Sequence, residues 1–166
     1  MSMKPVLHSF AYCLDYLRDQ VADVEPTDMV VQPSGVLNHP AWVIGHLTFS
    51  CQALGGEIGL AEWLPTTWAD KFGTGSVPVS EVSHYPNKTE ALATLRDAQC
   101  RITDAIEQPS EAQLDEPLPD ATSRAILPTV RHAITQVLIA HPANHIGQLT
   151  IWRRAMGLPQ VGRPFM

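Results

Sequence analysis

Four long stretches of this sequence repeat apolar residues at every third or fourth position, the periodicity of one face of an α-helix. They cover about residues 6–24, 38–59, 87–108 and 129–156. No stretch alternates between apolar and polar residues convincingly, as a half-buried β-strand does. The sequence therefore predicts an all-α fold with four long helices.

Local signals mark the ends of these helices. Asn38-His39-Pro40 is interpreted as an N-cap region with a first-turn proline, and Asn87 with Glu90 has the spacing of a capping box. Gly157, followed by a proline two residues later, is a strong stop signal. These signals place the helix ends near residues 40, 87 and 157.

The connections between the helices are long and rich in proline. Residues 60–86 form one that is far longer than a tight turn requires and long enough to join two parallel helices. Within it, PTTWADKFG (65–73) predicts one short helix ending at Gly73. Residues 108–128, with four prolines, are interpreted as a loop. We expect a single four-helix bundle.

The size and composition fit one cytoplasmic domain. A chain of 166 residues is long enough for one self-sufficient core, so we expect a single domain over residues 1–166. Its cysteines, Cys13, Cys51 and Cys100, are too few and too widely spaced for a disulfide framework or a CxxC metal site. The opening residues contain no apolar run typical of a signal peptide. A reducing, cytoplasmic location follows as an expectation.

Charge and hydropathy exclude two classes of partner. The net charge of −6 has the wrong sign for a nucleic-acid-binding protein. No window approaches the ~18 apolar residues of a membrane span. Residues 124–166 contain five arginines and no acid, which we interpret as solvated or paired with neighbouring acids. Among these, Arg153 and Arg154 lie off the apolar stripe of the last helix and are expected at the surface.

The last helix carries two histidines inside its apolar stripe. At 100° per residue, one face collects seven side chains: Val130, Ile134, Val137, His141, His145, Gln148 and Trp152. Side chains four residues apart on a helix point the same way, so His141 and His145 can reach one metal ion. Burying two imidazoles without partners costs several kcal/mol. Something must therefore satisfy these two rings.

A third histidine lies on another apolar strip. His46 shares a face of the second helix with Trp42, Phe49 and Ala53. Three neutral imidazoles from two facing helices can hold a divalent cation and leave positions open for substrate. The alternative is a set of core histidines bonded to backbone carbonyls or to each other. His132 points away from His141 on the helix, and His39, His8 and His84 are given no role, His39 being interpreted as a cap.

The segments NHPAWVIGHL (38–47) and HPANHIGQLTIWRRAMGLP (141–159), with KFG, then G, S and P, then YP between them, resemble the DinB/YfiT-like family of metal-dependent proteins. The resemblance covers nearly the whole chain. It implies an up-down-down-up four-helix bundle with a long crossover between the second and third helices. It also implies a three-histidine divalent metal site, which maps onto His46, His141 and His145, and homodimers.

Pro142 directly follows the first histidine of the pair. A proline inside a helix removes a hydrogen bond and clashes with the preceding turn. We expect a kink near Leu138 that re-aims His141.

The residues around the histidines suggest how such a site works. No carboxylate is expected close by, since Glu57 lies ~16 Å along the helix from His46. Gln148 can orient a ligand but cannot exchange protons usefully. Trp42, Phe49 and Trp152 are candidates for the pocket wall, with ordinary core packing as the alternative. Asn144 is a further pocket candidate.

Three functions are compatible with the sequence. The first is a metal-dependent enzyme of unknown substrate, a hydrolase or a thiol S-transferase that uses a low-molecular-weight thiol as co-substrate. The family that the chain resembles includes such transferases and maleylpyruvate isomerases. The second is a stress-related protein that binds a metal or ligand without turnover, and the third is a structural dimer. The metal is expected to be Zn, Ni, Fe or Mn, since imidazole suits several divalent ions. The expected partners are a small molecule and a second copy of the chain, with no nucleic acid and no membrane.

Overall fold

The fold, seen in a computed structural model that describes residues 2–164, is all-helical. Eight α-helices and no β-strand occur within those residues, where one isolated bridge joins Pro117 to Thr129. The predicted all-α class is confirmed. None of the described helices is both long and apolar enough to cross a membrane.

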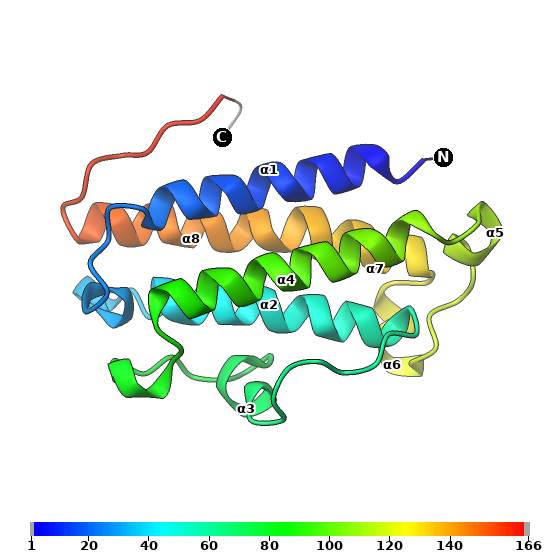
Figure 1. The fold of residues 1–166 in the computed structure, drawn as a ribbon, viewed down its shortest axis with the longest axis horizontal. Helices are drawn as coiled ribbons and strands as arrows, with labels where there is room; N and C mark the ends of the chain where they lie inside the picture. The colour runs from blue at the N-terminus through cyan, green and yellow to red at the C-terminus, as the bar shows by residue number, and fades with distance from the viewer. Residues whose placement is uncertain (1, 165–166) are drawn as a thin grey trace.

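Four long helical segments lie side by side and form the body of the molecule (Figure 1). They are α1 (Lys4–Val21), α2 (Pro40–Glu57), α4 (Lys88–Glu107) and a composite of α7 (Val130–Thr135), a π-helical turn η4 (Gln136–Ala140) and α8 (His141–Ala155). Helix α2 packs against α4, and α1 packs against η4 and α8. In Figure 1, α2 and α4 run in one direction and the other two segments run in the opposite direction.

The core lies between these segments. Each contributes side chains that are almost completely shielded from solvent, among them Leu14, Leu17, Ile44, Leu95, Ile102, Ile134, Leu138, Leu149 and Trp152. Burial of each large apolar side chain stabilises the fold by about 1.5–3 kcal/mol. This packing is what fixes α2 and α8 relative to one another.

The predicted helix starts are confirmed by their caps. The side chain of Asn87 accepts from the backbone N–H of Glu90, and the Glu90 carboxylate accepts from that of Asn87, so the capping box is complete. At α2, Nδ1 of His39 accepts from the backbone N–H of Trp42, and Pro40 occupies the first turn. His39 is thus a cap, as interpreted from the sequence.

The long connection after α2 follows the side of α2 (Figure 1). It contains the predicted short helix, α3 (Trp68–Phe72), which is capped by Gly73, and a 3-10 turn at Val82–His84. The Phe72 side chain is fully buried and packs over Gly45, where a Cβ atom would overlap the ring. Gly45 therefore allows α3 to approach α2 closely.

The second connection is more ordered than predicted. Instead of a loop, residues 108–128 hold two short helices, α5 (Glu111–Leu114) and α6 (Ala121–Ile126). Ser110 and Asp120 cap them with their side chains. Helices of four and six residues are too short to show an apolar periodicity, so the sequence alone did not predict them.

The last long segment is interrupted where a kink was expected. The chain bonds in π-helical fashion over Gln136–Ala140, and the backbone N–H of His141 donates to the carbonyl oxygen of Gln136, five residues back. Pro142 follows at once and has no N–H to donate to Leu138. A π-helical turn absorbs one extra residue, so the face buried after it is rotated relative to the face buried before it.

Candidate metal centre

Three imidazole rings from two long helical segments meet inside the fold. Nε2 of His141 lies 3.0 Å from Nε2 of His46 and 3.0 Å from Nε2 of His145. Potential ligand atoms of all three lie within 4.8 Å of one another. His46 and His145 are buried, and His141 is half-buried. The three histidines singled out in the sequence therefore lie together.

The second ring nitrogen of His46 is held by the crossover. Its Nδ1 lies 2.6 Å from the backbone carbonyl oxygen of Phe72, at the end of α3. A carbonyl oxygen only accepts hydrogen bonds, so Nδ1 must be the protonated nitrogen. The lone pair of the neutral ring then lies on Nε2, which faces the other two histidines.

The ring of His145 is held in the same tautomer by a side chain. Its Nδ1 lies 3.0 Å from Oε1 of Gln148, and that oxygen also accepts from Nδ2 of Asn38 at 2.8 Å. The chain Asn38–Gln148–His145 therefore places the proton of His145 on Nδ1. Two Nε2 lone pairs now face Nε2 of His141, which has at most one proton to donate between them in its neutral form.

Burial keeps these rings neutral. It lowers the pKa of His141 and of His145 to about 4, and it lowers the pKa of His46, because an imidazolium loses its hydration there. The neighbouring rings disfavour charge further on His141 and His145. Neutral imidazole is the form that ligates metals. The donor set, three neutral ring nitrogens, thus fits a divalent cation.

The other predicted pocket residues divide into two groups. Trp42 stacks on His46 with ring centroids 4.6 Å apart, and Gln148 bonds His145, so both touch the cluster. Phe49 is partly buried on α2, one turn beyond His46. Trp152 is fully buried and donates from Nε1 to the carbonyl oxygen of Val31. Asn144 is exposed on α8.

Two features of the surroundings were missed from the sequence. One is the pair of partners that orient the rings: the Phe72 carbonyl for His46, and Asn38, through Gln148, for His145. Each lies far along the chain from the ring that it orients. The sequence signal for Asn38 was its place at the start of α2. The other is Arg153, which was expected at the surface. It is 3% exposed and forms a two-pronged ion pair with Asp23.

A cavity of about 290 Å³ opens beside His141. Helix α2 contributes one wall, η4 and α7 another, and the segment from Leu118 to Leu127 covers it. His141 is therefore the histidine of the cluster that borders this cavity. The segment that covers the cavity was not predicted from the sequence.

Comparison with known families finds a match. The sequence profile of the DinB superfamily matches residues 9–149, a range that includes all three histidines. A search of curated proteins found no match.

Proposed function

The chain belongs to the DinB superfamily, and from that premise we propose that it binds one divalent metal ion through His46, His141 and His145 and works as a metal-dependent enzyme. The observation that carries the proposal is the convergence of three Nε2 atoms, with 3.0 Å between His141 and each of the other two. In core histidines that bind no ligand, nothing favours an arrangement in which the Nε2 lone pairs point toward one another.

The groups that contact His46 and His145 have defined tasks in this proposal. The Phe72 carbonyl and Gln148 hold the protons of His46 and His145 on Nδ1, away from the centre. Such partners orient ligating imidazoles and raise their basicity. Trp42 covers one side of His46 and excludes water there. When bound, a divalent cation supplies Lewis acidity, which lowers the pKa of a thiol or of water and polarises a carbonyl group.

The surroundings favour transfer to or from a thiol over hydrolysis. Within residues 2–164, the group of potential ligands at the centre consists of the three histidines alone. Hydrolysis usually needs a general acid or base within hydrogen-bond reach, whereas a thiol can be activated by a metal without one. We therefore infer a low-molecular-weight thiol as co-substrate. Zn, Ni, Fe and Mn remain the candidate ions, because three nitrogens do not select among them.

We also infer that the architecture is an up-down-down-up four-helix bundle. Support comes from the opposite directions of the two helix pairs in Figure 1 and from the packing of α2 on α4 and of α1 on α8. The crossover that contains α3 joins the two parallel helices, as a bundle with this topology requires.

Titration of a small thiol tests the enzymatic proposal. Zinc-loaded protein is expected to lower the pH at which mercaptoethanol forms its thiolate, measured by ultraviolet absorbance, and His145→Ala is expected to abolish that effect. An unchanged titration rejects the transferase. A panel of esters, amides and lactones then tests the hydrolase, and absence of any metal-dependent turnover would leave a binding protein without catalysis.

A further inference from the structure

The cavity beside His141 has a chemical character of its own. Six of its lining residues are apolar: Ala53, Leu54, Leu118, Leu127, Ala133 and Val137. Ser50, Thr74, Ser123 and Gln136 add neutral polar groups. Glu57 is the one lining residue with a formal charge, and no lysine or arginine is among them. A volume of about 290 Å³ is at the lower end for ligand pockets, so the occupant must be compact.

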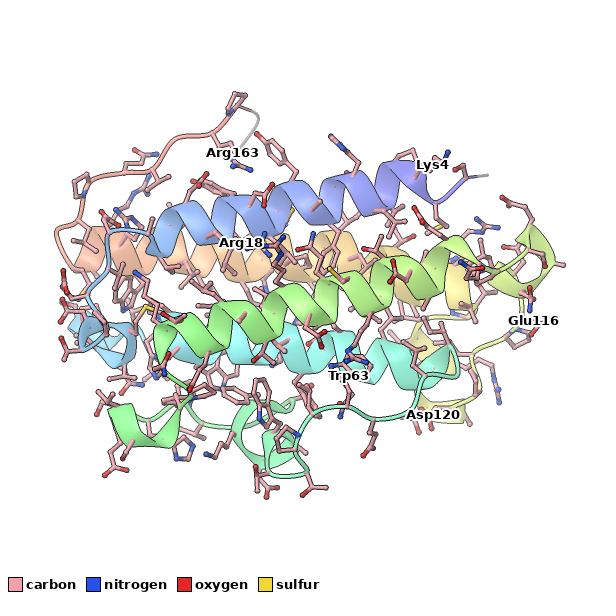
Figure 2. The ribbon with its side chains drawn as sticks, in the orientation of Figure 1. Lys4, Arg18, Trp63, Glu116, Asp120 and Arg163 are labelled. Carbon is pink, nitrogen blue, oxygen red and sulfur yellow. The ribbon has the colours of Figure 1, made fainter. Side chains whose placement is uncertain are left out.

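The charge lies at the end of the cavity away from the histidines. Glu57 is in the last turn of α2, three turns beyond His46, and its carboxylate accepts a long bond, 3.5 Å, from the backbone N–H of Asp120. Asp120, which Figure 2 labels beside the C-terminal end of α2, adds a second carboxylate nearby. Arg124 is the nearby cation, and its guanidinium donates to the carbonyl oxygens of Leu118 and Pro119.

We propose that this cavity binds a compact, largely apolar amine. The hydrocarbon part packs against Leu54, Leu118 and Leu127, and the ammonium group pairs with the carboxylate of Glu57, which lines the same cavity. We expect an anion of the same shape to bind more weakly, because no lysine or arginine lines the cavity and Glu57 does. The Arg124 guanidinium is bonded to the carbonyl oxygens of Leu118 and Pro119. The amine then extends toward His141, which lines the same cavity.

That this amine is the substrate rests on the proposed function; that it binds does not. If the metal centre is a thiol transferase, the cavity is where the second substrate binds, with its ammonium end at Glu57 and its other end toward His141. A thiol that bears carboxylates must approach the metal from outside this cavity. The segment that contains α6 then closes one side of this pocket, through Leu118, Ser123 and Leu127.

Amine binding in the cavity is tested on metal-free protein, because an amine can also ligate a metal ion at the histidines. Benzylamine, benzyl alcohol and benzoate are titrated into the metal-free, ¹⁵N-labelled chain and followed by NMR. We expect benzylamine to bind at least about ten-fold more tightly than benzoate, the scale of one charge-assisted hydrogen bond. The amide shifts are expected at Ser123, Leu127 and Val137. Equal binding of the amine and the acid, or shifts elsewhere, overturns the proposal.

Two variants test whether the carboxylate of Glu57 binds the ammonium group. Glu57→Gln keeps the size of the side chain and is expected to weaken benzylamine binding at least about ten-fold, while benzyl alcohol binds as before. Glu116→Gln, which removes an exposed carboxylate outside the cavity, is the matched control and is expected to change nothing. If both variants bind benzylamine as the wild type does, Glu57 does not select the ligand and the proposal fails. His145→Ala should lose the metal and keep the amine, so the two sites fail separately.

Discussion

Oε1 of Gln148 lies 3.0 Å from Nδ1 of His145 and fixes which nitrogen of that ring faces the other histidines. Removal of this acceptor frees the ring to rotate and to exchange its tautomer. Gln148→Ala is therefore expected to weaken zinc affinity about 10–100-fold, and Gln148→Glu, which keeps an acceptor, to retain most of it. Competition with a chromogenic chelator measures both. Asn144→Ala, on the exposed side of the same helix, is the control; an equal loss there would contradict the role of Gln148.

Substitution of Gly45 tests whether α3 must pack closely against α2. Alanine in place of glycine inside a helix normally stabilises it by about 1 kcal/mol. At Gly45 the new methyl group would overlap the Phe72 ring, whose backbone carbonyl holds His46. Gly45→Ala is expected to lower both the free energy of unfolding and zinc affinity. Gly56→Ala, in the same helix with open space around it, is expected to stabilise; similar effects of the two variants would refute this packing.

Pro142 is expected to support the metal centre at the expense of helix stability. Proline in a helix interior costs about 3 kcal/mol relative to alanine, and here it directly follows the π-helical turn that sets the direction of His141. Pro142→Ala should keep or raise the melting temperature while it weakens zinc binding at least about ten-fold, a loss of the size that misplaced ligands produce. Calorimetry and zinc titration measure the two effects. Unchanged zinc affinity would mean that packing alone sets the π-helical turn.

His39 makes the metal-free protein sensitive to acid. Burial lowers its pKa from 6.5 to about 4. Between these values the unfolded chain binds more protons than the folded one, so the stability is complete above pH 6.5 and falls as the pH drops toward 4. His39 contributes at most about 3–4 kcal/mol of this loss, and His141 and His145 add to it. His39→Asn keeps a cap and should flatten urea-unfolding stability against pH; an unaltered slope would contradict this account.

Arg153 is expected to matter for folding and not for metal binding. Its buried guanidinium donates to Asp23 and to the carbonyl oxygens of Gln20 and Pro159, and the pairing lowers the pKa of Asp23. Arg153→Ala leaves these groups without a partner and should cost about 3 kcal/mol of stability. Arg154→Ala, at the exposed neighbour, is the control and should cost little. Chemical denaturation tells the two apart, and equal costs would contradict the burial of Arg153.

Helix content was predictable because its signals are local. The periodicity of the four long segments and the cap formed by Asn87 and Glu90 depend on residues within a few positions of one another. The pairing of His46 with the HxxxH motif was predictable for a similar reason, since each lies on an apolar helix face. Partners from distant segments were not predictable: the Phe72 carbonyl reaches His46 only because α3 docks over Gly45.

Arg153 and the cavity cover show the same limit. An arginine next to an apolar stripe reads as exposed unless its acid, here Asp23 at the end of another helix, is known to lie opposite. The π-helical turn also shifts the buried face of α8 by part of a turn, which an ideal 100° spacing does not include. Helices α5 and α6 are too short for periodicity to reveal them.

Metal content measured by elemental mass spectrometry on tag-free protein tests the central claim most directly. The wild type and His132→Ala, an exposed histidine of the same segment that bonds Thr129, are each expected to carry about one divalent ion per chain, the capacity of a single three-histidine site. His141→Ala is expected to carry almost none. A wild-type chain that stays metal-free after refilling with Zn, Ni, Mn and Fe would show that His46, His141 and His145 are core histidines and would contradict the account.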